Sequence, residues 1–130
     1  MSRVQEYTAS FVPPFTQMAG VAALRGPQNH IQQWRDECQD LRLQAAAMFN
    51  SLPGVHCPIT EGTTFLFPRF TGGETSTELA QRLLNEALVT VTPGSGFGDS
   101  GEGHLRVSLM RSPVDRVLEG VERITRVLRG

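Results

Sequence analysis

One arginine follows closely after a glycine-rich segment, and these two features are the first candidates for chemistry. Residues 92–104, TPGSGFGDSGEGH, carry five glycines, and Arg106 lies two residues further on in the apolar run HLRVSLM. Glycine-rich loops bind phosphates through backbone N–H groups. A guanidinium presents a planar fork that matches a carboxylate. The segment therefore suggests either a phosphate loop or a carboxylate-binding arginine.

The phosphate loop is disfavoured by its context. Gly96, Gly98 and Gly101 match G-x-G-x-x-G, the pattern of dinucleotide-binding folds. In that pattern the loop opens a helix whose N-terminus faces the pyrophosphate, whereas this loop opens a strand-like run. A P-loop is also excluded, because all 12 basic residues are arginine and none is lysine. The glycines instead predict a mobile loop with positive φ angles and close backbone approach.

Arg106 gains a direction from the alternation of side chains along a strand. Leu105, Val107 and Leu109 fall on one face and predict core positions, while Arg106 and Ser108 fall on the other. A charged side chain on such a face is most often solvated. The functional alternative is that Arg106 binds a carboxylate in a cleft over which the glycine loop closes. The residues alone leave both interpretations open.

Composition limits the classes of function. A chain of 130 residues suffices for one domain, and 39% hydrophobic with 19% charged residues is typical of soluble globular proteins. The net charge of −1 gives no basic excess for nucleic acid. No apolar stretch approaches the roughly 20 residues of a membrane span, and MSRVQEYTAS lacks a signal-peptide core. We expect a cytoplasmic protein with no nucleic-acid or membrane partner.

The sequence predicts no metal site. Cys57 neighbours His56, but no second pair of ligands follows at zinc-like spacing, and His30 and His104 stand apart. Cys38 and Cys57 are expected to be reduced thiols. Without lysine, this chain also lacks the amine that Schiff-base chemistry requires.

The hydrophobic pattern predicts an α+β fold, a small sheet of short strands covered by helices with a long N-terminal helix. Residues 11–25 predict a short apolar helix, and residues 1–26 are taken as a segment leading into a domain at 27–130. Apolar residues at steps of three and four then predict a long helix packed along that domain. The stripe is Ile31, Trp34, Cys38, Leu41, Ala45, Met48 and Leu52, with Asp36, Glu37, Asp40 and Arg42 on the other faces.

Short strands and two further helices follow. A capping box of Thr75 and Glu78 predicts a helix that continues to Leu88, and Ser112 is a plausible cap for a last helix ending near Leu128. The phenylalanines of the second strand alternate with Leu66 and are expected to pack in the core. Strands are predicted at residues 55–59, 63–70 (with Phe65 and Phe67 on one face), 89–92 and 104–110.

At residues 90–108 the sequence resembles the signature near the C-terminal end of class I/II aminotransferases, fold-type I enzymes that use pyridoxal phosphate. Looser similarity extends over residues 15–28, SLPGV, EGTTFLFPRF and the last helix, so the resemblance covers nearly the whole chain. The signature positions are Val91, Pro93, Gly94, Phe97, Gly98, Gly101, Glu102, Gly103, His104, Arg106 and Ser108.

This resemblance implies that the chain is the C-terminal small domain of a longer, homodimeric enzyme that moves an amino group between an amino acid and a 2-oxo acid. In the family the arginine of this strand, here Arg106, binds the α-carboxylate of the substrate. The loop near the substrate would consist of Gly94, Ser95, Gly96, Phe97 and Gly98.

Two departures accompany the resemblance. The family holds pyridoxal phosphate mainly on a large N-terminal domain through a lysine, so this chain is expected to lack catalytic residues and to be inactive alone. The long helix has Leu41-Arg42-Leu43 where the family often has Arg-Arg-Asp. Two alternatives stay open: a lyase or decarboxylase of the same fold type, and a free-standing domain that binds carboxylates or a protein. The apolar stretch FVPPFTQMAGVAAL argues against the second, because it resembles a surface meant to be covered.

Overall fold

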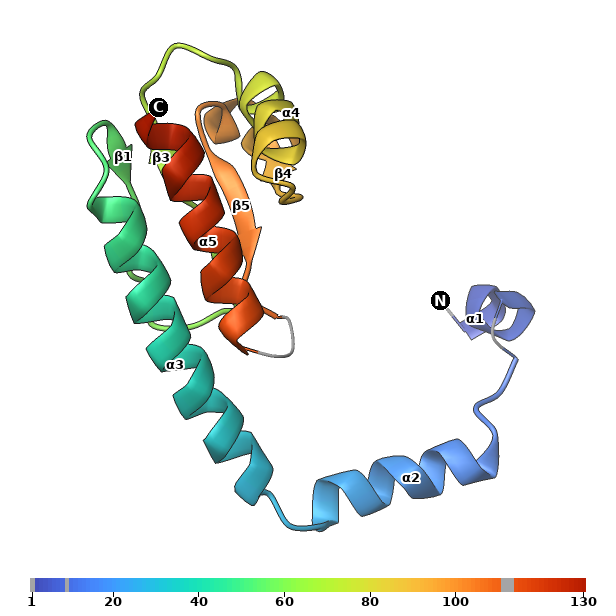
Figure 1. Cartoon of the computed structure of the whole chain (residues 1–130). Coiled ribbons are helices and arrows are strands. Elements are labelled where there is room, and N and C mark those ends of the chain that lie inside the picture. The colour runs from blue at the N-terminus through green and yellow to red at the C-terminus, as the bar shows by residue number, and fades with distance from the viewer. Residues whose placement is uncertain (1, 9, 111–113) are drawn as a thin grey trace. The chain divides into compact units, whose positions relative to one another are not determined.

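The computed structural model describes residues 2–8, 10–110 and 114–130, and it confirms the α+β fold (Figure 1). The chain forms two compact units, Met1–Trp34 and Arg35–Gly130. The division falls within the long helix α3, Asn29–Asn50. The predicted boundary between residues 1–26 and 27–130 stays a prediction.

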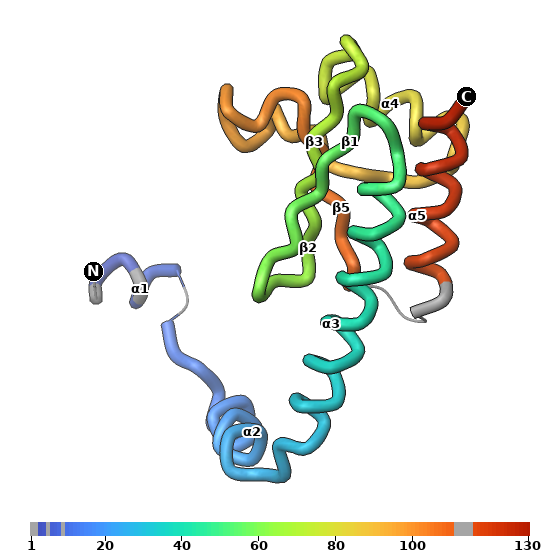
Figure 2. Tube along the Cα trace, turned by 90° about the vertical axis from the view of Figure 1, so that its left-hand side faces the viewer, coloured from blue at the N-terminus to red at the C-terminus, as the bar shows by residue number. Residues whose placement is uncertain are grey.

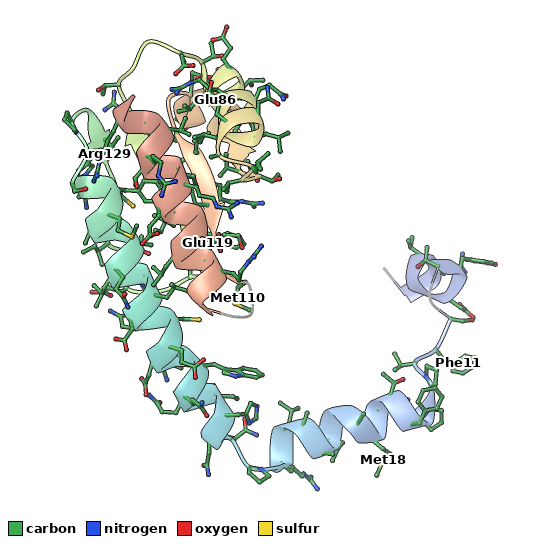
Figure 3. The ribbon with its side chains drawn as sticks, viewed as in Figure 1. Phe11, Met18, Glu86, Met110, Glu119 and Arg129 are labelled. Carbon is green, nitrogen blue, oxygen red and sulfur yellow. The ribbon has the colours of Figure 1, made fainter. Side chains whose placement is uncertain are left out.

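The first unit exposes its apolar residues. It contains α1 (Ser2–Thr8), which the sequence did not predict, and α2 (Pro14–Arg25), which it did. Proline suits the first turn of α2 because that turn needs no N–H donor there. No residue of α2 is buried, and Figure 3 shows Phe11 and Met18 extending from this segment. Large apolar side chains of this unit, including Phe11, Phe15, Met18 and Leu24, are thus exposed.

Helix α3 packs over only part of its length. Leu41 and Ala45 of the predicted stripe are buried, whereas Ile31 is 42% and Trp34 61% exposed. The expectation that the whole stripe packs along the domain is therefore wrong for the first turns. Those turns belong to the first unit, where the Trp34 ring meets the His30 ring edge to face, with 5.1 Å between centroids.

Arg42 corrects a second expectation for this helix. We expected it on an exposed face, but it is only 4% exposed. Its guanidinium donates to the Thr63 carbonyl at 3.0 Å and to the Gln39 side chain. These two bonds satisfy the terminal nitrogens of the buried guanidinium, whereas its buried Nε has no hydrogen-bond partner among the described residues. Arg42 thereby fixes the segment that leads into the second strand.

The strands are short and form two antiparallel sheets. β1 (Val55–His56) pairs with β3 (Arg69–Phe70). The other sheet has the order β2-β5-β4, comprising Phe65–Leu66, Leu105–Ser108 and Thr92–Pro93.

All four predicted strands have different bounds in the structure. The strand predicted at 63–70 divides into β2 and β3 around Pro68, which has no N–H to give a ladder. The strand predicted at 89–92 pairs only from Thr92, while Val89 and Val91 pack against the core instead. The strands predicted at 55–59 and 104–110 also shorten, to Val55–His56 and Leu105–Ser108.

Two helices complete the second unit. α4 (Ser76–Glu86) begins with the predicted capping box: Glu78 N–H donates to Thr75 Oγ1 at 3.2 Å, and Thr75 N–H to Glu78 Oε2 at 2.9 Å. It ends two residues before the predicted Leu88, which adopts a positive φ of 55°. α5 spans Val114–Arg129, and the proposed cap Ser112 lies outside the described residues.

The core of the second unit lies between its strands and its helices. The C-terminal half of α3 and α5 lie side by side on one face of the strands, as Figures 1 and 2 both show. Its largest fully buried side chains include Phe49, Leu66, Leu83, Leu105 and Ile124. One member of this set is Leu105 of β5, so the strand that carries Arg106 is anchored directly in the core.

We predict that Phe49→Ala lowers the free energy of unfolding by about 3–5 kcal/mol, because it removes a fully buried ring and leaves a cavity. The matched control is Phe15→Ala on α2, where the ring is 77% exposed and the loss should stay within about 0.5 kcal/mol. Urea unfolding of the 130-residue chain measures both. Equal losses for the two variants would contradict the described core.

Candidate carboxylate-binding site

Arg106 lies on the face of β5 opposite the core, as the alternation predicts. Leu105 and Val107 are buried, and Arg106 between them is half-buried. Its guanidinium carbon Cζ lies 4.7 Å from the ring centroid of Phe65 and 5.0 Å from that of Phe97. These distances are typical of cation–π contacts.

The Arg106 guanidinium makes few polar contacts among the described residues. Its one hydrogen bond in the described part of the chain runs to Thr92 Oγ1 at 3.4 Å, which is long for such a bond. No carboxylate among residues 2–8, 10–110 and 114–130 forms an ion pair with it, so its N–H groups are available to a ligand. Ion pairs that do form elsewhere among the described residues include Arg82–Glu74, Arg116–Glu119 and Arg123–Glu119.

Further rings continue from this site. Phe97 meets Phe67 edge to face with 5.8 Å between centroids, and Phe67 stacks on His104 at 4.9 Å and 11°. We call Phe97, Phe67 and His104 the aromatic row. Offset stacking and edge-to-face contacts are the arrangements that ring quadrupoles favour. The row therefore places Arg106 at one end of a set of mutually packed rings.

Phe65 and Phe67 of the strand predicted at 63–70 were expected in the core, and this expectation is wrong. Phe65 is 37% exposed and Phe67 half-buried, whereas Leu66 is 1% exposed. The reason is the register of β2 on β5. Phe65 pairs with Ser108 and so shares the face of Arg106, while Leu66 pairs with Val107 on the core face.

The glycine segment is folded rather than open. It forms two short 3-10 turns, η1 (Gly94–Phe97) and η2 (Asp99–Gly101). The expected mobility of this loop stays a prediction. Gly94 and Gly101 are buried with their backbones in contact, and a Cβ on either would lie 2.0 Å from the other's carbonyl oxygen. The predicted close approach and positive φ are both present, the latter at Gly98 with φ 103°.

Glu102 ties this segment to the first turn of α4. Its carboxylate accepts from Ser76 N–H at 2.6 Å, from Ser76 Oγ at 3.1 Å and from Gly103 N–H at 3.0 Å. Ser95 N–H in turn donates to Ser76 Oγ at 3.2 Å. The Ser76 backbone bond is the largest cause that lowers the pKa of Glu102 below the ordinary value for glutamate. We call these contacts the Glu102 tie.

No role for Glu102 or Ser76 was predicted from the sequence, in which Glu102 was only one position of the signature. The pair is separated by 26 positions, and the local signal at Ser76 is only that it follows the Thr75 cap. Of the predicted loop, Ser95 and Phe97 make the contacts named above, whereas a Cβ on Gly96 would meet nothing within 4 Å. The structure thus brings Phe97 to Arg106 and leaves Gly96 apart.

We predict that Gly101→Ala destabilises the fold by about 1–3 kcal/mol, because its methyl group would collide with the Gly94 carbonyl. Gly96→Ala is the matched control in the same segment and should change the free energy of unfolding by less than about 0.5 kcal/mol. Thermal and urea unfolding measure the pair. Similar stability in both variants would mean that the glycine contact is absent.

We predict a pH-dependent contribution from Glu102. Because folding lowers its pKa, its stabilisation is present above the unfolded pKa and is lost as the pH falls through the folded pKa. The stability gap between the wild-type chain and Glu102→Gln should be largest near neutral pH and narrow in acid. Urea unfolding of both proteins between pH 7 and pH 3 checks this, and a gap that widened in acid would contradict it.

The described residues contain no group of three or more His, Cys, Asp or Glu side chains that could hold a metal ion. Among the same residues, no helix combines the length and the apolar character needed to cross a membrane.

Comparison with known proteins gives this site a context. The family described as "Aminotransferase class I and II" matches residues 2–124. The chain is 32% identical over 130 residues to an LL-diaminopimelate aminotransferase of Maridesulfovibrio salexigens, covering 98% of this chain and 32% of that protein. It is 30% identical to an aspartate aminotransferase of Pyrococcus horikoshii, covering 100% and 34%.

Solved structures agree with the sequence relatives. The aromatic aminotransferase from Pyrococcus horikoshii superposes with a TM-score of 0.90 at 32% identity, over 98% of this chain and 34% of that one. The chain thus spans about a third of the length of the relatives it matches. With a family match over most of its residues and with this fold, the chain belongs to the class I and II aminotransferases.

Proposed function

We propose that the protein containing this chain is a pyridoxal-phosphate-dependent aminotransferase that moves an amino group between an amino acid and a 2-oxo acid. In this proposal the chain supplies Arg106, which binds the α-carboxylate of the substrate. The observation that carries the proposal is a half-buried guanidinium with one long hydrogen bond and no ion pair among the described residues.

The chemistry of the guanidinium supports this role. A carboxylate can accept two parallel N–H bonds from arginine, each with a net worth of about 1.5–3 kcal/mol. Such a pair fixes both the position and the rotation of the bound amino acid. In transamination this orientation matters, because the Cα–H bond must be held in one direction for the proton to be removed.

Pyridoxal phosphate is part of the proposal, but the 130 residues of this chain do not by themselves provide a site that could hold it. Pyridoxal phosphate supplies an electron sink when it is bound. Its usual covalent anchor is a lysine, and the 130 residues contain none. We therefore expect the lysine, and most cofactor contacts, from a large N-terminal domain outside this chain. We expect the 130-residue chain to be catalytically inactive alone.

The same proposal includes the protein's partners. The large domain, and a second copy of the protein in a homodimer, are the surfaces we expect to cover the apolar residues of the first unit. Leu24 is 82% and Phe15 77% exposed there, which is unusual for large apolar side chains grouped on one segment. Amino-acid and 2-oxo-acid substrates and a cytoplasmic location complete the proposal.

A size measurement separates this proposal from a free-standing binding domain. An antibody raised against residues 35–130 should detect, in cells of the source, a protein well above the 14.3 kDa of this chain. A single band at 14.3 kDa would overturn the proposed enzyme. It would leave a domain whose ligand is to be sought at Arg106.

A product assay separates transamination from the lyases and decarboxylases of the same fold type. The full-length protein should consume an amino acid only when a 2-oxo acid acceptor is present, and it should yield a new amino acid. Turnover without an acceptor, with release of ammonia or carbon dioxide, would assign it to one of those classes instead.

We predict that Arg106→Ala in the full-length protein raises the KM for the amino acid by about 100-fold, since two charge-assisted bonds are lost. Binding of pyridoxal phosphate, followed by its absorbance, should be unchanged. The control is Arg126→Ala on α5, which should leave KM unaltered. This arginine is exposed and forms no ion pair among the described residues. Unaltered turnover in Arg106→Ala would reject the assignment.

A further inference from the structure

We propose that Phe65 and Phe97 are positioning residues for the proposed reaction, because together they hold the Arg106 guanidinium ready for a carboxylate before the substrate arrives. The inference rests on the proposed function, since it takes Arg106 as the carboxylate-binding group. It adds two residues whose effect on the substrate passes through Arg106.

The first step is that polar contacts do not fix the guanidinium. An arginine side chain has many rotamers, and holding one of them costs conformational entropy. The long bond to Thr92 Oγ1 is the single hydrogen bond of Arg106 among the described residues. The contacts that remain to select a rotamer are those with the two rings, at 4.7 Å and 5.0 Å.

The second step is that the rings reach Arg106 from both neighbours of β5. In the order β2-β5-β4, Phe65 belongs to β2, and Phe97 follows β4 in the turn η1. A side chain that has a ring supplied from either side has less freedom to swing along the sheet. Rings also offer no strong acceptor, so the N–H groups stay free for a ligand.

The third step is that Phe97 is itself held in place. Its ring packs against Phe67, which stacks on His104. Its turn is joined to α4 through the Glu102 tie, in which Ser95 N–H donates to Ser76 Oγ. Contacts within the chain itself therefore hold the Phe97 ring in place. This is what a preorganised site requires, since ordering costs are then met in folding and not in binding.

The experiment uses Phe97→Leu and Phe65→Leu in the full-length protein, each keeping an apolar side chain without a ring. We expect KM for the amino acid and for the 2-oxo acid to rise by about 5- to 10-fold in each variant. The kcat and the cofactor absorbance should change much less. Phe97→Tyr restores a ring and should restore KM.

A double-mutant cycle shows whether the effect passes through Arg106. In an Arg106→Ala background, Phe97→Leu should have no further effect on KM. The matched control is Phe70→Leu, whose ring packs edge to face on the core residue Phe49. It should lower the melting temperature and leave KM unchanged, which separates general destabilisation from positioning.

A second readout does not depend on activity. In the NMR spectrum of the 130-residue chain, the Arg106 Nε–Hε resonance should be displaced by ring currents, and Phe97→Leu should return it toward the random-coil position. If Phe97→Leu does not fold, Phe65→Leu provides the same comparison.

The outcomes separate the two proposals. The positioning role alone would be overturned if Phe65→Leu and Phe97→Leu changed neither the Arg106 resonance nor KM while Arg106→Ala still raised KM. The same holds if Phe97→Leu raises KM equally with and without Arg106. An unaltered KM in Arg106→Ala would instead overturn the proposed function beneath it.

Discussion

The arrangement of the groups around Arg106 depends on one carboxylate, that of Glu102, which binds the first turn of α4. Glu102 accepts three hydrogen bonds, two of them from Ser76 at the first turn of α4. Helix N-termini favour negative charge, because their first N–H groups lack partners within the helix and the helix dipole is positive there. The tie fixes the end of the glycine segment, and Ser95 extends it to the turn that carries Phe97. The position of the Phe97 ring beside Arg106 thus depends on the hydrogen bonds that Glu102 and Ser95 make with Ser76.

Features governed by neighbouring residues were predictable from the sequence. The capping box of Thr75 and Glu78 is formed as expected, because both partners lie within one helical turn. The direction of Arg106 was predictable too, since alternation along a strand needs only the strand itself. The long helix was also found, with Pro53-Gly54 just beyond its end.

Features that depend on distant residues were not predictable in this way. The burial of Arg42 requires an acceptor at Thr63, and no periodicity within α3 reveals that partner. Placing Phe65 and Phe67 requires the register of β2 on β5, which alternation cannot supply because it does not say which face is covered. The Glu102 tie is of the same kind. For the candidate site, the sequence identified Arg106 and the loop, whereas the rings around the guanidinium and the support of the loop needed the fold.

The contact between Gly94 and Gly101 has a consequence for how this segment can diverge. Each glycine meets the main-chain carbonyl of the other, so the obstacle to a side chain at one position is backbone and not a side chain that a second substitution could shorten. No single compensating replacement at the partner position relieves the collision. We therefore expect descendants of this chain either to keep both Gly94 and Gly101 or to change the backbone of the whole glycine segment. We expect few intermediate sequences in which only one of the two glycines is replaced.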